Sequence, residues 1–204
     1  MHIFCIFVQN IEHIMKRIAV FASGSGSNAE NIAHYFKESE EIEIALILSN
    51  KSDAFVHDRA KQLNIPSYTF SKKEFDEGAI VLDFLREHQI DFIVLAGFLL
   101  KVSEVLINAY PQRIINIHPA LLPKFGGKGM YGHNVHNAVI SAGEKESGIT
   151  IHYINEYYDE GAVIFQASCP VLKEDTADSL AQRVQALEYL HFPTIIEEVC
   201  KKVC

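Results

Sequence analysis

RIAVFA at residues 17–22 runs directly into SGSGSN at residues 23–28. The first stretch is apolar and contains β-branched side chains, which is typical of a buried strand. The two glycines that follow allow a tight turn. Residues 28–38 then carry apolar side chains at the spacing of one helix face. This strand–turn–helix unit predicts that the chain begins an α/β sheet.

The same alternation continues through the first two thirds of the chain. Residues 91–96 (DFIVLA) are almost continuously apolar, as expected for a strand of a parallel sheet covered on both faces. Further strands are predicted at residues 42–48, 66–70 and 113–117, and helices at residues 54–63 and 75–88. The pattern favours a doubly wound, mostly parallel α/β sheet.

The last third of the chain has a different pattern. Residues 148–155 alternate between apolar and polar side chains, and residues 162–171 give another strand close by. Two strands so close in sequence predict an antiparallel C-terminal extension of the sheet. Helices are predicted at residues 135–142 and 176–202. No linker or repeat interrupts residues 15–204, which we interpret as a single domain. Residues 1–14 are interpreted as a leader or dispensable extension, because Met15 opens a stretch that resembles a natural start.

Composition excludes several classes of protein. The 204 residues are 49% hydrophobic and 22% charged, which argues against a disordered chain. A formal net charge of −8 and the lack of a basic stripe argue against a nucleic-acid partner. No apolar run approaches the ~20 residues that span a bilayer, so no membrane partner is expected. The four cysteines show no disulfide or zinc spacing, which predicts reduced thiols and a cytoplasmic location.

The SGSGSN turn allows two interpretations. Glycines let the backbone approach a ligand, and the N-terminus of the following helix favours an anion such as phosphate. Alternatively, the segment is a simple turn in which Ser27 or Asn28 caps the helix. A dinucleotide fits less well, because no acidic residue follows the second strand before Asp53.

Asn116 and His118 form a second candidate group, at the end of the predicted strand 113–117. Alternation along a strand places both side chains on the same side, so that both can face one ligand. The amide of Asn116 can donate to a developing oxyanion, and His118 can donate or accept a proton near neutral pH. The alternative is a strand-end histidine bonded to the backbone.

Asp159 lies in a predicted turn between the last two strands. Its carboxylate either bonds the local backbone or stabilises a protonated His118. His133 and His136 have a helical spacing, but no third ligand completes a set around them, so no metal is expected. No serine, cysteine or threonine lies in a nucleophile elbow, which argues against an acyl-enzyme.

Taken together, six motifs resemble those of the phosphoribosylglycinamide formyltransferases, the folate-dependent enzymes of purine synthesis. The motifs are SGSGSN at 23–28, SNK at 49–51, LAGF at 95–98, NIHPALLPKF at 116–125, DEGAVIFQ at 159–166 and RVQALE at 183–188. The resemblance extends over roughly residues 15–203. It implies a formyltransferase-like fold and transfer of the formyl group of 10-formyltetrahydrofolate, as co-substrate, to the amine of N1-(5-phospho-D-ribosyl)glycinamide. It implies no metal, and a monomer or homodimer.

The resemblance also implies roles for individual residues. The catalytic positions are Asn116, His118 and Asp159. The phosphoribosyl substrate is held by Gly26, Ser27, Asn28, Gln185 and Glu188. The folate is held by Lys72, Leu99, Leu100, Lys101, Val102, Asn116, Asn155, Glu156, Tyr157, Tyr158 and Asp159. The glycine-rich stretch 126–132 is expected to form a mobile lid.

A hydrolase with a similar catalytic domain, formyltetrahydrofolate deformylase, is the main alternative. That enzyme usually carries an extra N-terminal domain of about 80 residues, for which residues 1–14 leave no room. The chain also departs from the transferase pattern at the folate tail, where Lys72 or Lys73 stands in place of an arginine. A lysine lacks the two-pronged contact that arginine makes with a carboxylate.

Overall fold

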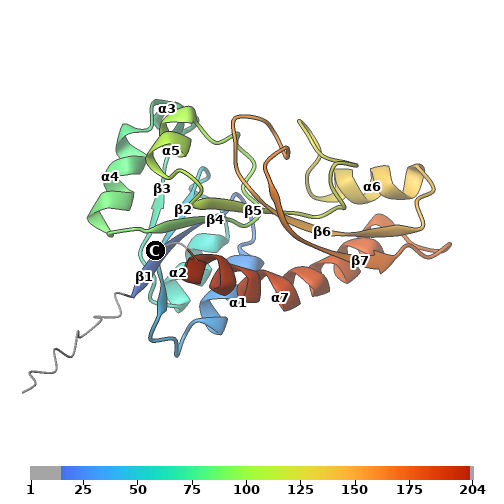
Figure 1. Cartoon of the computed structure of the whole chain (residues 1–204), viewed down its shortest axis with the longest axis horizontal. Helices are drawn as coiled ribbons and strands as arrows, with labels where there is room; N and C mark the ends of the chain where they lie inside the picture. The colour runs from blue at the N-terminus through green and yellow to red at the C-terminus, as the bar shows by residue number, and fades with distance from the viewer. Residues whose placement is uncertain (1–14, 203–204) are drawn as a thin grey trace, which may run out of the picture.

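The computed structural model describes residues 15–202, so the predicted leader at residues 1–14 lies outside the described residues. Within that range seven strands form one sheet in the order β3-β2-β1-β4-β5-β6-β7 (Figure 1). The strands are β1 (Lys16–Phe21), β2 (Ile42–Ser49), β3 (Ser67–Thr69), β4 (Phe92–Leu95), β5 (Ile114–His118), β6 (Glu146–Tyr153) and β7 (Val163–Pro170).

The sheet is parallel from β3 to β5, and β6 and β7 are added antiparallel. This topology confirms the predicted α/β class with an antiparallel C-terminal extension. Both β2 and β4 pair with β1, so the chain reverses its direction of winding between β1 and β4. Ligands of open α/β sheets bind outside the carboxyl ends of the strands at such a point.

Helices cover both faces of the sheet. They are α1 (Ser27–Tyr35), α2 (Val56–Gln62), α3 (Lys72–Glu77), α4 (Ala79–Glu87), α5 (Glu104–Ala109), α6 (His133–Ser141) and α7 (Ala177–Lys202). Successive side chains of β1 face opposite sides of the sheet and therefore belong to different halves of the core. Ile18 and Val20 pack with α1, α2 and α7, whereas Ala19 and Phe21 pack with α3, α4 and α5. The central strands are apolar on both sides because both sides are covered.

One helix was predicted wrongly from the sequence, and another was missed. The helix predicted at residues 75–88 is divided into α3 and α4 by Gly78, which has φ 79°. A left-handed residue interrupts a helix, and glycine adopts this conformation at low cost. In addition, α5 was not predicted; at six residues it is too short to show a clear apolar period.

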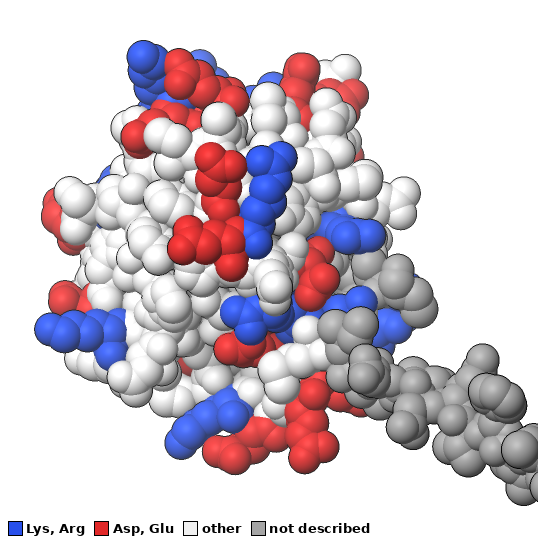
Figure 2. Space-filling view, turned by 90° about the vertical axis from the view of Figure 1, so that its left-hand side faces the viewer, with Lys and Arg blue, Asp and Glu red and all other residues white. Residues whose placement is uncertain are grey.

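No helix among residues 15–202 is long and apolar enough to cross a membrane. Figure 2 shows lysines and arginines interspersed with aspartates and glutamates on the face that it draws. That face therefore offers no continuous basic surface of the kind that binds nucleic acid.

Candidate active site

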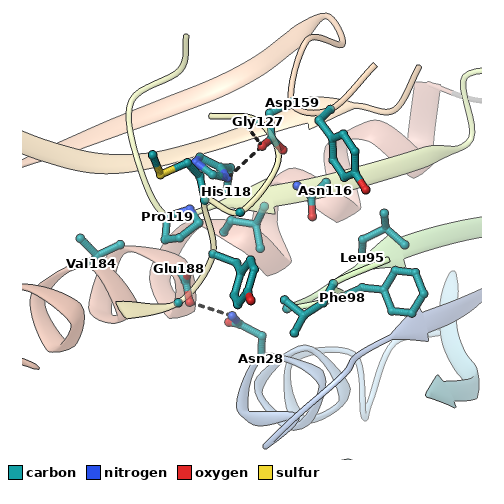
Figure 3. A pocket seen from close by; sticks show the side chains of 18 of the residues that line it. Asn28, Leu95, Phe98, Asn116, His118, Pro119, Gly127, Asp159, Val184 and Glu188 are labelled. Atoms are coloured by element: carbon teal, nitrogen blue, oxygen red, sulfur yellow. Dashed lines mark hydrogen bonds and ion pairs between the residues drawn. The ribbon is translucent and has the colours of Figure 1, made fainter. Parts of the chain in front are cut away.

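A cavity of about 940 Å³ lies beyond the carboxyl ends of β4 and β5. Its wall takes side chains from the loop after β4, from β5, from the glycine-rich segment before α6, from the loop after β6 and from α7. Figure 3 shows Asn116, His118 and Asp159 together on one side and Asn28 with Glu188 on another. A cavity of this size is at the upper end of the usual range for small-molecule sites.

Asn116 is oriented by a histidine that lies beside it in the sheet. Asn116 on β5 pairs with His152 on β6, and its Nδ2 lies 3.1 Å from Nε2 of His152. The Nδ1–H of His152 donates to the carbonyl oxygen of Tyr153 at 2.9 Å, because a carbonyl can only accept. Nε2 of His152 therefore carries the lone pair and accepts from Asn116. One N–H of the Asn116 amide is used in this way, and the second is available to a ligand.

The environment keeps His152 in the neutral form that this hydrogen bond requires. The side chain is fully buried, and burial lowers the pKa of His152, an effect that the Tyr153 carbonyl and Asp159 only partly oppose. A neutral imidazole has one donor and one acceptor nitrogen, so the orientation of the Asn116 amide is set.

His118 is enclosed between a backbone carbonyl and a carboxylate. Its Nε2–H donates to the carbonyl oxygen of Phe125 at 2.8 Å. Its Nδ1 lies 3.6 Å from Oδ2 of Asp159. The carboxylate of Asp159 thus lies on the Nδ1 side of the ring, opposite the backbone carbonyl that accepts from Nε2.

Asp159 lies in a turn, but its carboxylate is directed away from that turn. It is a turn residue in a left-handed conformation, with φ 56°, yet its carboxylate does not bond its own turn. Instead, Oδ2 accepts from the backbone N–H of Gly127 at 2.9 Å, and Oδ1 lies 3.7 Å from Nε2 of His152. The turn is tight: a Cβ at Gly161 would lie 1.7 Å from the carbonyl oxygen of Tyr153. The turn thus directs the carboxylate towards both histidines.

At the other end of the cavity, Asn28 joins α1 to α7. Its Nδ2 donates to Oε2 of Glu188 at 2.7 Å, and Nε2 of Gln185 donates to Oγ of Ser27 at 3.3 Å. Burial raises the pKa of Glu188, and the Asn28 hydrogen bond partly opposes this. The N-cap of α1 is Gly26 and has no side-chain hydrogen bond, so the interpretation of Ser27 or Asn28 as the helix cap was wrong.

Ser23 connects the glycine turn to the loop after β4. Its hydroxyl donates to Oδ1 of Asn50 at 2.6 Å and accepts from the N–H of Leu99 at 2.9 Å. Phe98 in the same loop packs edge-on against Phe21 of β1, with ring centroids 5.4 Å apart. These contacts fix the loop after β4 relative to the glycine turn.

Comparison with known proteins assigns this arrangement to a family. A family model described as "Formyl transferase" matches residues 16–196. The chain belongs to the formyl transferase family. It is 39% identical to the chloroplastic phosphoribosylglycinamide formyltransferase of Arabidopsis thaliana, over 92% of this chain and 66% of that protein. It is 37% identical to phosphoribosylglycinamide formyltransferase of Bacillus subtilis (strain 168), over 91% of this chain and 95% of that protein.

Solved structures agree with the family assignment. Phosphoribosylglycinamide formyltransferase from Anaplasma phagocytophilum is 36% identical with a TM-score of 0.85, covering 93% of this chain and 89% of that one. Glycinamide ribonucleotide transformylase 1 from Symbiobacterium toebii is 31% identical with a TM-score of 0.86, covering 94% and 90%. The resemblance drawn from the motifs is confirmed. The formyl transferase chain spans slightly less than two thirds of the two plant relatives, 66% and 62% of their lengths.

Most of the residues predicted for the site line the cavity described above. They are Asn28, Leu99, Leu100, Lys101, Val102, Asn116, His118, Asn155, Tyr157, Tyr158, Asp159, Gln185 and Glu188. Gly26, Ser27, Lys72 and Glu156 are not part of its wall. Ser27 touches the wall through Gln185, and Lys72 lies at a neighbouring cavity of about 350 Å³, where it pairs with Asp76.

Other residues of the site escaped the sequence analysis. One is His152 on β6, which binds Asn116 on the neighbouring strand. His136, Gln182 and the segment Gly127–Gly132 line the cavity. The helical spacing of His136 did not indicate that it lines the cavity. The glycine-rich stretch, in contrast, was expected to form a lid near the ligands. Among residues 15–202 no group of three or more histidine, cysteine or acidic residues could hold a metal.

Two of the buried histidines, His136 and His152, predict how the stability of the protein depends on pH. Burial lowers the pKa of His136 and of His152 below the ordinary value of 6.5. Below that pH the unfolded chain takes up protons that the folded chain does not, so the free energy of unfolding falls as pH decreases. Above pH 6.5 both states bind few protons at these histidines, so the free energy of unfolding is not reduced in this way.

We expect His136→Gln to reduce the fall in unfolding free energy at low pH, because it removes one of the two histidines whose pKa is lowered by burial. Urea denaturation at about pH 7.5 and about pH 5.5 measures it as the difference in unfolding free energy. His34→Gln, at an exposed position of α1, is the matched control and should leave the difference unchanged. Equal differences in wild type and His136→Gln would contradict the prediction.

Proposed function

We propose that the chain transfers the formyl group of 10-formyltetrahydrofolate to the amine of N1-(5-phospho-D-ribosyl)glycinamide, a step of purine biosynthesis. The observation that carries this proposal is that one cavity holds both predicted binding regions and the three candidate catalytic residues. The names of the relatives support it. A cytoplasmic location is part of the same proposal, supported by the free thiols of Cys169 and Cys200.

The phosphoribosyl substrate is placed at the Asn28 and Glu188 end. The turn before α1 supplies backbone N–H groups near the phosphate, and Glu188 and Asn28 offer an acceptor and an amide to polar groups of the sugar. The folate is placed against the loop after β4 and the loop after β6. We expect its ring to lie among Leu99–Val102, Asn155, Tyr157 and Tyr158, which line the cavity and offer both backbone groups and aromatic side chains.

Asn116 and His118 act on the formyl group. Attack of the amine on the formyl carbon produces a tetrahedral oxyanion, and the second N–H of Asn116 donates to it together with protonated His118. The carboxylate of Asp159 faces Nδ1 of His118 and orients the ring. A proton passes from the attacking amine to the departing folate nitrogen, through water or His118. No covalent intermediate is required.

For His118 to reach the oxyanion, Nε2 must give up its hydrogen bond to Phe125. Phe125 has φ 56° and directly precedes the glycine-rich segment, in which Gly127, Gly129 and Gly132 also have positive φ. We propose that this segment moves when substrates bind and releases Nε2. Catalytic hydrogen bonds often form only in the substrate complex.

An assay of formyl transfer distinguishes transferase from deformylase. Purified protein is given 10-formyltetrahydrofolate with and without phosphoribosylglycinamide, and tetrahydrofolate and free formate are both measured. We expect tetrahydrofolate release to depend on the amine, because the amine held near the formyl carbon is the nucleophile. Rapid release without the amine, with formate as product, would instead identify a hydrolase.

A further inference from the structure

The turn proposed to hold phosphate rests against the first residues of α2. The N–H of Val56 donates to the carbonyl oxygen of Gly24 at 3.2 Å. Gly26 has φ 71°, and a Cβ at that position would lie 2.3 Å from Cγ2 of Val56. The turn is therefore packed too closely against α2 to accept a side chain at Gly26, and its shape depends on α2.

Arg59 of α2 contacts the chain both before and after Gly26–Asn28, the residues proposed to bind the phosphate. Its Nε donates to the carbonyl oxygen of Ser25 at 2.9 Å. Its Nη1 forms an ion pair with the carboxylate of Glu30, in the first turn of α1. The guanidinium also lies over the ring of Phe55, with Cζ 5.1 Å from the centroid. One side chain thus bridges the residue before Gly26–Asn28 and a residue just after it.

The ion pair also controls charge at the proposed phosphate site. Glu30 is the acidic residue in the first turn of α1, the same helix end that is expected to attract phosphate. An unpaired carboxylate at that place would repel a dianionic phosphate. Arg59 neutralises it, and the pair is only partly exposed, with side-chain exposures of 22% and 30%.

We propose that Arg59 is a positioning residue for the phosphate of the phosphoribosyl substrate, acting through Ser25 and Glu30. The proposal rests on the function proposed above. Arginine suits this task because its planar guanidinium has several donors in fixed directions, whereas a lysine ammonium at the end of a flexible chain cannot reproduce both contacts.

Steady-state kinetics with each substrate varied in turn tests the proposal. Arg59→Ala is expected to raise the KM for phosphoribosylglycinamide by about tenfold, the effect of losing one hydrogen bond to a charged group. The KM for 10-formyltetrahydrofolate and kcat at saturation should stay close to wild type. Arg59→Lys should raise the first KM by a smaller factor. Arg86→Ala, an exposed arginine paired with Asp83 on α4, is the matched control and should change neither KM.

A double variant separates charge from geometry. Arg59→Ala with Glu30→Gln removes the unpaired carboxylate, so the KM for phosphoribosylglycinamide should recover in part but remain above wild type. If Arg59→Ala does not fold, Arg59→Lys decides alone. A wild-type KM in Arg59→Lys, or equal increases in both KM values, would overturn the proposal. A wild-type protein that transfers no formyl group would instead refute the proposed function.

Discussion

Asp159→Asn lowers kcat by about 10²–10⁴-fold, the range attributed to a positioned acid–base group, and leaves both KM values near wild type. An asparagine can still accept from Gly127 N–H through Oδ1. In the wild type the oxygen that accepts from Gly127 is also the one that faces Nδ1 of His118, at 3.6 Å. In the variant an uncharged amide oxygen therefore faces His118, and Nδ2 lies towards Nε2 of His152. The variant thus removes the negative charge beside Nδ1 of His118, and with it the electrostatic support for a positively charged donor at the oxyanion.

Measurements of kcat at saturating concentrations of both substrates test this expectation. Glu160→Gln is the matched control, because it removes one carboxylate at the adjacent exposed position and should keep full activity. A thermal melt shows whether each variant is folded. If Asp159→Asn turned over at the wild-type rate, Asp159 would be a turn residue without a catalytic role.

Asn116→Ala lowers kcat by about 10²–10³-fold, the effect of removing one oxyanion donor. In the wild type, His152 holds the Asn116 amide so that one N–H is bonded and the other is available to a ligand. The alanine variant loses this donor and also leaves Nε2 of the buried His152 without its partner. The lost donor acts on the transition state more than on the bound substrates, whereas the unpartnered nitrogen lowers the free energy of unfolding.

Asn116→Asp tests whether the expected loss of activity comes from the lost hydrogen-bond donor and not from a change of size. The substituted side chain has nearly the same size and shape, but its ionised carboxylate only accepts. We expect it to be as inactive as Asn116→Ala when kcat is measured at saturation. Substantial activity in Asn116→Asp would mean that Asn116 fills space beside His152 rather than donating to the oxyanion.

The sequence by itself determined the fold class and much of the site. RIAVFA followed by SGSGSN predicts a buried strand and a turn into a helix, because both depend on local side-chain types. Alternation along residues 113–118 placed Asn116 and His118 on one side of a strand, and both line the cavity. The boundary at Gly78 and the short helix α5 were missed, because a single left-handed residue and a six-residue helix leave little periodicity.

Only the tertiary structure decided which groups act on which. Asp159 could have bonded its own turn, but the tight approach of Gly161 to Tyr153 and the N–H of Gly127 direct its carboxylate to His118. Asn28 meets Glu188 across 160 positions of sequence, and Arg59 meets Glu30 across 29. Local spacing carries no information about such pairs, because they form only when the order of the strands and the packing of the helices bring distant segments together.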